Sequence, residues 1–294
     1  MHVTALYRYP VKSLQGAAVD SAQVEPIGLA GDRRWMVIDA AGRFVTRRER
    51  PQMALVHAAP AEGGLLLRHG DDALHVSFPD AEASAPEVTI WRDHVPARLG
   101  SAEAGAMLSA AIGVDVRLVY LDDPAARPVD LAYGDAGDRV SFADGFPVLL
   151  TSEESLSDLN ARLDEPVSMR RFRPNIVISG MAPWDEDMLR RVRIGETVFR
   201  VVKPCSRCVM VTQDPDSGEI RNGNEPLTTL RKMGRMAKGG VMFGQNLVPD
   251  RLGTIRVGDD VEPLETGPSN LVRTGGAGAL HSSSRHPDPS TSSG

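Results

Sequence analysis

Cysteine is almost absent from this chain of 294 residues, which contains only Cys205 and Cys208. Two cysteines cannot form a disulfide framework, and a cysteine-ligated iron–sulfur domain requires several more. No apolar run approaches the roughly 18–20 residues that span a bilayer, and the first residues resemble neither a signal peptide nor a transit peptide. We therefore expect a cytoplasmic protein without a membrane partner, in which both cysteines remain thiols.

Positive charge is also in deficit, since 33 Lys and Arg residues stand against 39 Asp and Glu, a net charge of −6 at pH 7. This balance argues against a broad nucleic-acid-binding face. The arginines clustered in 47–51 and 169–174 are expected to contact a small anion or to lie in solvated loops. The sequence has no P-loop, no G-x-S-x-G elbow and no H-E-x-x-H motif, so nothing in it favours a P-loop nucleotide-binding protein or a hydrolase.

The first hundred residues contain many short segments of β type. HVTALYRYP (2–10), RRWMVID (33–39), RFVT (43–46), MALVHAAP (53–60) and EVTIW (87–91) alternate partially between apolar and polar residues, and turn residues separate them. This pattern predicts a small antiparallel barrel or sandwich.

The remaining segments mix helices with further strands. Ala-rich spacing predicts a helix over 101–113, and PLTTLRKM (226–233) reads as a short second helix. Strands are predicted at VRLVYL (116–121) and VMVTQ (209–213), among others. The segment DPDSG (214–218) begins like a calcium loop but lacks the ligand spacing of an EF-hand, so a β-turn is the favoured interpretation.

A further helix is predicted to begin near Thr151. Thr151 and Glu154 have the T-x-x-E spacing of a capping box. Leu156, Leu159 and Leu163 would then lie on one face and pack into the core.

These segments together predict a mainly β, mixed α+β fold with two domains that share a seam. We place a small N-terminal β-barrel domain at 1–120 and a second β-barrel domain with peripheral helices at 121–266. Residues 267–294 are predicted to be a disordered, low-complexity tail, because fifteen of these 28 residues are Gly, Ser or Pro.

Both cysteines lie in PCSRC (204–208), and the motif alone leaves four interpretations open. They are a thioredoxin-like dithiol, half of a zinc site, one metal-binding thiolate beside a second cysteine, and a pair without special chemistry. Zinc needs four ligands, and the seven histidines are isolated in the sequence. Dithiol motifs normally open a helix, whereas a strand is predicted after Cys208. Arg207 would favour a thiolate at Cys208, and thiolates are soft metal ligands.

Basic and polar residues stand at the ends of several predicted strands: Lys12, Ser13, Arg33, Arg173 and Asn175. Each one alone is most simply a solvated surface residue. Loops at strand ends commonly carry ligand contacts, and several such loops together would form a cradle for an anion.

The motifs LYRYPVKSLQG (6–16), GLAGDRRWMVID (28–39), FRPNIVISG (172–180), PCSRCVMVTQDPDSG (204–218) and GTIRVGDDV (253–261) occur in this order. The ordered set resembles the MOSC proteins of the amidoxime-reducing type, over roughly residues 1–265. The resemblance implies an N-terminal MOSC β-barrel domain followed by a MOSC β-barrel domain with peripheral helices.

The resemblance also implies a molybdenum cofactor, a pterin that carries a dithiolene and a phosphate. Carried over position by position, the metal ligand is Cys208, and Cys205 is its neighbour. The implied cofactor contacts are Lys12, Ser13, Arg33, Arg173, Asn175, Ser206, Arg207 and Cys208 itself.

The activity implied is that of a molybdenum-dependent oxidoreductase that reduces N-hydroxylated small molecules such as amidoximes, hydroxylamines and N-hydroxylated bases. Cys208 and Asp144 are the predicted catalytic residues, with Asp144 as proton donor or, alternatively, a turn residue. Electrons are expected from a separate donor protein of ferredoxin, flavin or haem type. A non-catalytic carrier of cofactor or sulfur is the main alternative, and a plain dithiol oxidoreductase is a third.

Overall fold

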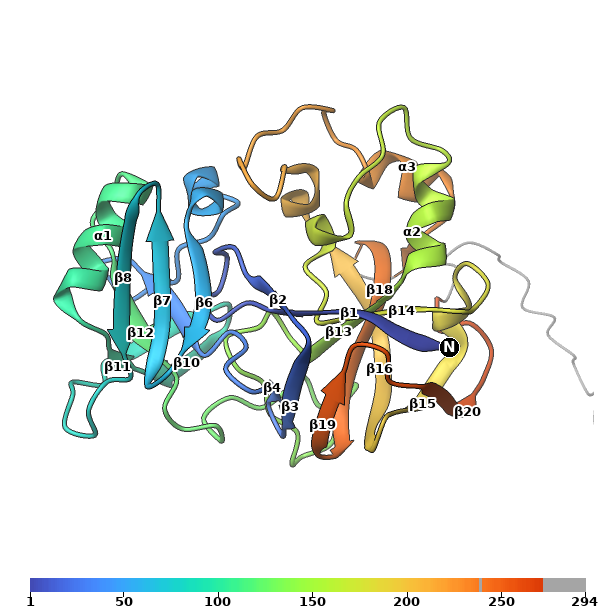
Figure 1. The fold of residues 1–294 in the computed structure, drawn as a ribbon, viewed down its shortest axis with the longest axis horizontal. Helices are drawn as coiled ribbons and strands as arrows, with labels where there is room; N and C mark the ends of the chain where they lie inside the picture. The colour runs from blue at the N-terminus through green and yellow to red at the C-terminus, as the bar shows by residue number, and fades with distance from the viewer. Residues whose placement is uncertain (238–239, 272–294) are drawn as a thin grey trace, which may run out of the picture.

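The computed structural model describes residues 1–237 and 240–271, and Figure 1 shows two lobes lying side by side. The described residues form twenty β-strands, three α-helices and four 3₁₀ turns. The predicted fold class, mainly β with peripheral helices, is therefore confirmed. The tail predicted over 267–294 lies outside the described residues from 272 onward.

The first lobe is built from small antiparallel sheets and one helix. Three strands pair in the order β6-β7-β8, three in the order β11-β12-β5, and β9 pairs with β10. The elements are β5 (Trp35–Ile38), the 3₁₀ turn η1 (Pro51–Leu55), β6 (His57–Ala61), β7 (Gly64–His69), β8 (Asp72–Ser77), β9 (Glu87–Ile90), β10 (Asp93–Pro96), β11 (Arg98–Leu99), α1 (Ala102–Ile112) and β12 (Arg117–Tyr120).

Helix α1 confirms the Ala-rich prediction. The Ser101 side chain accepts a hydrogen bond from the backbone N–H of Ala104 at 3.2 Å, and Gly113 ends the helix with a left-handed backbone, φ 79°. Leu108 and Ile112 pack with Trp35 of β5 in the core of this lobe.

The second lobe contains a nine-stranded sheet in the order β2-β1-β14-β13-β18-β16-β15-β20, with β17 beside β18. Its strands are β1 (His2–Arg8), β2 (Ala17–Val19), β13 (Val148–Ser152), β14 (Ile176–Ser179), β15 (Leu189–Ile194), β16 (Thr197–Arg207), β17 (Met236–Ala237), β18 (Gly240–Arg251) and β20 (Val261–Thr266). The first strand of the chain thus belongs to the sheet of the second lobe, where Leu6 lies opposite Ile176.

The small sheet β19-β3-β4 also joins the two halves of the sequence. It joins β3 (Ser21–Glu25) and β4 (Gly28–Leu29) to β19 (Gly253–Arg256). Ala22 and Ile255 are paired there and are both buried in the core of the second lobe.

Two helices cover one end of the nine-stranded sheet: α2 (Glu153–Asn160) and α3 (Leu227–Lys232), which confirms the helix predicted from PLTTLRKM. The predicted capping residue of α2 was wrong. The cap is Ser152, whose hydroxyl accepts from Ser155 N at 3.3 Å, because β13 runs through Thr151 and the chain turns one residue later. Leu163 lies beyond the end of the helix but still packs against the core.

Two predicted strands were wrong, and a third is correct only in its second half. VMVTQ (209–213) contains a 3₁₀ turn, η4 (Val209–Thr212), because Val211 is buried beneath the helices and Arg171 donates to the carbonyl of Thr212 at 3.0 Å. RFVT (43–46) forms only isolated bridges. In MALVHAAP the strand begins only at His57, because η1 occupies the residues up to 55.

Candidate functional site

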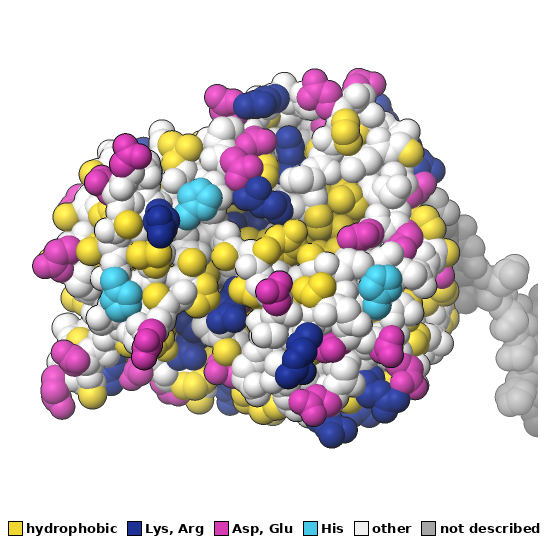
Figure 2. All heavy atoms as spheres, viewed as in Figure 1, with side chains coloured by type: hydrophobic (Ala, Val, Ile, Leu, Met, Phe, Trp, Pro, Cys, Tyr) yellow, Lys and Arg dark blue, Asp and Glu magenta, His cyan; other side chains and the backbone are white. Residues whose placement is uncertain are grey.

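A pocket at the junction of the two lobes, here called the seam pocket, collects all nine predicted site residues. They are Lys12, Ser13, Arg33, Asp144, Arg173, Asn175, Ser206, Arg207 and Cys208. On the face shown in Figure 2, basic side chains gather along this junction. Segments separated by almost two hundred residues in the sequence therefore converge, as an anion cradle would require.

The sequence analysis missed several other residues of the seam pocket. Among them are Arg48, Phe146, Arg171, Phe172 and Asn246. The arginine clusters at 47–51 and 169–174 contained a signal for two of them, but sequence alone does not show which arginine of a cluster points inward.

Strand β16 delivers both cysteines to the pocket. It pairs with β18 up to Arg207, and Cys208 follows with an extended backbone, φ −110° and ψ 179°. Both cysteines are half-buried free thiols. Arg207 donates from Nη1 to the sulfur of Cys205 at 2.9 Å and from Nη2 to the carbonyl of Phe172 at 2.5 Å. The Cys208 carbonyl accepts from Val211 N at 3.2 Å, but its sulfur has no hydrogen-bond partner among the described residues and is available to a ligand.

Lys12 and Asp144 form an ion pair on the opposite wall. The backbone N–H of Lys12 is fixed to Trp35 O at 2.8 Å, and its Nζ donates to the carbonyl of Phe142 at 2.8 Å and to the Asp144 carboxylate. The Lys12 side chain is only 6% exposed. Burial lowers the pKa of Lys12 to about 8, although Asp144 partly opposes this effect.

The environment of Asp144 differs from that of Lys12, because the Asp144 side chain is 65% exposed and stands beside several cations. Partial desolvation in the pocket would raise its pKa, but the charge and hydrogen bond of Lys12, with Arg48 and Arg33 behind it, hold the pKa well below its usual range. The carboxylate is therefore ionised at neutral pH.

Beneath the pocket, hydrogen bonds among Arg33, Arg173 and Asn175 join the two lobes. Arg33 donates to Asn175 Oδ1 at 3.0 Å and to the carbonyl of Arg173 at 3.1 Å, while Asp32 accepts its third contact at 2.5 Å. Both guanidinium groups lie near the ring of Tyr9, at 4.6 Å for Arg33 and 4.2 Å for Arg173.

Backbone strain is concentrated at this site. Among the described residues, five that are not glycine have a positive φ, and three of them line the seam pocket: Ser13 at 69°, Arg33 at 49° and Arg173 at 53°. Such conformations cost about 1–3 kcal/mol each and persist where the surroundings fix them, typically at functional sites.

The seam pocket also contains donors without acceptors. The Nε atoms of Arg48 and Arg207 and one Nη of Arg173 are buried and make no hydrogen bond within the described part of the chain. An unsatisfied buried donor is costly, and a ligand with negatively charged oxygens would remove that cost. Residues 1–237 and 240–271 contain no cluster of three or more His, Cys, Asp or Glu placed to hold a metal.

Fold and site define a two-domain MOSC protein. The MOSC N-terminal beta barrel domain matches residues 1–115, and the MOSC domain matches residues 137–262. The chain belongs to the MOSC family, which confirms the resemblance inferred from its motifs. It is 34% identical to mitochondrial amidoxime-reducing component 1 of Mus musculus over 277 residues, 88% of this chain and 81% of that protein.

Two further relatives are a second amidoxime-reducing component and a molybdenum cofactor sulfurase. Mitochondrial amidoxime-reducing component 1 of Homo sapiens is 34% identical over 280 residues, 88% of this chain and 82% of that protein. Molybdenum cofactor sulfurase of Oryza sativa subsp. japonica is 32% identical over 264 residues, 83% of this chain but only 32% of the longer relative. No helix among the described residues of the present chain is both long and apolar enough to cross a membrane.

Proposed function

We propose that the protein reduces N-hydroxylated small molecules, such as amidoximes, at a molybdenum cofactor held in the seam pocket. Electrons would come from a separate donor protein. The observation that carries the proposal is the convergence of the Cys208 sulfur, which has no hydrogen-bond partner among the described residues, with Lys12, Arg33 and Arg173 in one strained, cationic pocket. The amidoxime-reducing relatives supply the class of substrate.

The residues present fit such a cofactor. Cys208 would supply the protein's one ligand to the metal, and the Nε donors of Arg48 and Arg207, unpaired within the described residues, suit the anionic oxygens of a pterin phosphate. When bound, the cofactor would supply the two-electron redox chemistry that removes oxygen from the N-hydroxylated substrate. The protein supplies the ligand, the orientation and a positive environment.

The pair of Lys12 and Asp144 would handle the proton. An ionised carboxylate accepts a proton more readily than it donates one, whereas the Lys12 ammonium, with a pKa of about 8, can release one near neutral pH. In this proposal Lys12 Nζ holds the proton and Asp144 keeps that ammonium oriented toward the pocket. Asp144→Asn should therefore change the pH profile of turnover more than the affinity for substrate.

Comparison of Cys208→Ala with Cys205→Ala tests the proposal. Protein from cells able to make the cofactor should contain about one equivalent of molybdenum, lost in Cys208→Ala and largely kept in Cys205→Ala, whose sulfur contacts Arg207. Reduction of a benzamidoxime-type substrate by chemically reduced donor should follow the molybdenum content. Metal-free wild-type protein from such cells would refute the proposal.

The sulfurase relative supports a second candidate, a module that carries the cofactor or sulfur without turnover. That protein would bind molybdenum at Cys208 but fail to reduce the substrate with any reduced donor. A persulfide on Cys208, detected by mass spectrometry, would favour the sulfur version.

A further inference from the structure

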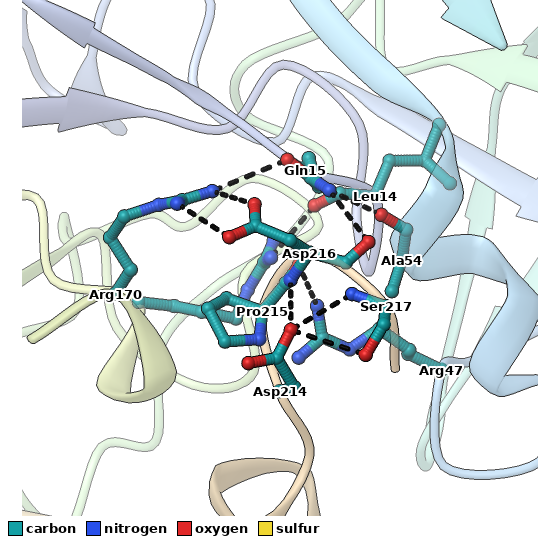
Figure 3. A network of polar contacts seen from close by, with 10 residues as sticks. Leu14, Gln15, Arg47, Ala54, Arg170, Asp214, Pro215, Asp216 and Ser217 are labelled. Carbon is teal, nitrogen blue, oxygen red and sulfur yellow. Dashed lines mark hydrogen bonds and ion pairs between the residues drawn. The ribbon is translucent and has the colours of Figure 1, made fainter. Parts of the chain in front are cut away.

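A second pocket adjoins the seam pocket and has no part in the proposed reaction. It is here called the Tyr9 pocket, and its lining includes Tyr7, Tyr9, Gln15, Arg47, Arg170 and Arg173. Arg173 lines both pockets. In Figure 3, Arg170 and Arg47 approach from opposite sides of the loop 214–217.

Three buried donors of this pocket lack an acceptor. Arg47 is 1% exposed and Tyr9 is 4% exposed. Within residues 1–237 and 240–271, the Tyr9 hydroxyl, Nη2 of Arg47 and Nη2 of Arg173 make no hydrogen bond. All three residues line the Tyr9 pocket, so a ligand that offers several acceptor atoms would satisfy donors that the chain leaves unpaired.

Charge in the pocket is only partly compensated. Arg170 is neutralised by Asp216, at 2.6 and 3.1 Å. Arg47 contacts only neutral groups, the side chain of Gln213 at 3.0 Å and a backbone carbonyl at 3.4 Å. Arg173 donates to the backbone carbonyl of residue 14 at 2.7 Å.

No carboxylate pairs with Arg47 or Arg173 in the part of the chain that the structure describes. The carboxylate of Asp214, the other acid on this loop, accepts from the backbone N–H groups of Asp216 and Ser217, both at 3.0 Å, within its own turn. Burial lowers the pKa of Arg47, although the charge of Asp214 partly opposes this effect, and burial together with Arg33 lowers that of Arg173.

We propose that the Tyr9 pocket binds a phosphate-type oxyanion, either free phosphate or the phosphate group of a small metabolite, by means of Arg47, Arg173 and the Tyr9 hydroxyl. Arginine offers paired donors to phosphate oxygens, and the phenol adds a third donor from a different segment. The proposal goes beyond the reductase function and does not depend on it.

Occupancy would act on both lobes. Arg47 belongs to the first lobe. It donates to the side chain of Gln213, just before the loop shown in Figure 3, and to the carbonyl of Pro215, within that loop. Gly218, at the end of this loop, leaves no room for a side chain, since an added Cβ would lie 2.4 Å from the carbonyl oxygen of Pro51. An anion on Arg47 and Arg173 would therefore fix the loop against the first lobe and orient the arginine that the two pockets share.

Calorimetric titration of the full chain with inorganic phosphate tests the proposal. Tyr9→Phe removes a hydroxyl that has no partner, so the variant should remain folded and bind phosphate about tenfold more weakly, as expected for loss of one hydrogen bond to a charged group. Arg47→Gln should weaken binding at least as much. Lys12→Ala, which removes a cation from the seam pocket alone, is the matched control and should leave phosphate affinity unchanged.

The outcomes are separable. Tyr9→Phe binding phosphate as tightly as wild type, or no heat of binding with wild type, would overturn the proposal. Loss of binding in Lys12→Ala with retention in Tyr9→Phe would place the anion in the seam pocket and would overturn it as well. Repetition of the titration with a phosphate monoester distinguishes free phosphate from a phosphorylated metabolite: tighter binding of the monoester supports the metabolite, and tighter binding of phosphate supports the free ion.

Discussion

Glu186 is a fully buried acid, and its ionisation should make folding stability depend on pH in an unusual direction. It lies in the 3₁₀ turn η3 (Asp185–Met188), is 0% exposed and accepts a hydrogen bond from Ser155 Oγ at 2.7 Å. Its other oxygen has no partner within the described residues. Burial, together with the charge of Asp187, raises the pKa of Glu186 from 4.5 to about 7.

The sign and size of the effect follow from proton linkage. Between pH 4.5 and about 7 the folded protein retains a proton that the unfolded chain has lost, so the free energy of unfolding contributed by this group falls as pH rises. At about 1.4 kcal/mol per pH unit, the total is on the order of 3 kcal/mol and is lost once the pH passes the folded pKa.

Glu186→Gln should remove this dependence while keeping an acceptor for Ser155. Denaturant unfolding at about pH 8 should show the variant to be more stable than wild type by roughly 1–3 kcal/mol, with the difference vanishing near pH 4.5. Glu49→Gln, a change of the same kind at an exposed position, is the control and should shift stability equally at both pH values. A difference between Glu186→Gln and wild type that does not grow with pH would refute the reasoning.

Two other perturbations of this structure have expected outcomes. Asp187→Asn breaks a buried, two-bond ion pair with Arg235 and should lower the free energy of unfolding by about 3–5 kcal/mol, as measured in urea; a loss below about 1 kcal/mol would contradict the pairing. Gly218→Ala adds a Cβ 2.4 Å from the carbonyl oxygen of Pro51 at φ +77°, whereas Gly63→Ala at φ +69° meets nothing within 4 Å. Thermal unfolding should therefore show a clearly larger loss for Gly218→Ala, and equal losses would show that the close approach is relieved without cost.

Local chemistry made some of this fold predictable from sequence. Ser101 and Gly113 mark the ends of α1 because capping depends on side-chain and backbone properties of single residues. The motifs identified residues of the seam pocket in a similar way, because each motif specifies which residue types stand at the end of a strand. Neither the capping residues nor the motifs specify how the motifs are arranged relative to one another in space.

What could not be predicted depends on contacts between distant segments. The pairing of Leu6 with Ile176 places the first strand of the chain in the second lobe, and no local pattern encodes a partner 170 residues away. Val211 has strand propensity, but its burial beneath the helices and the bond from Arg171 to Thr212 override it. The Tyr9 pocket was missed because Arg47 and Arg173 come from different clusters of arginines.

The geometry of β16 bears on one of the interpretations that the motif itself left open, a redox-active pair of cysteines. The chain is extended from Thr197 through Cys208, so three residues separate the two Cα atoms by about 10 Å, beyond the roughly 7 Å that a disulfide tolerates. Both cysteines line the seam pocket, but Arg207 donates to the sulfur of Cys205 at 2.9 Å, whereas the Cys208 sulfur makes no hydrogen bond within the described residues. A disulfide would require the chain between the two cysteines to leave this extended conformation, so the spacing that suggested a dithiol instead separates a cysteine that contacts Arg207 from the proposed metal ligand.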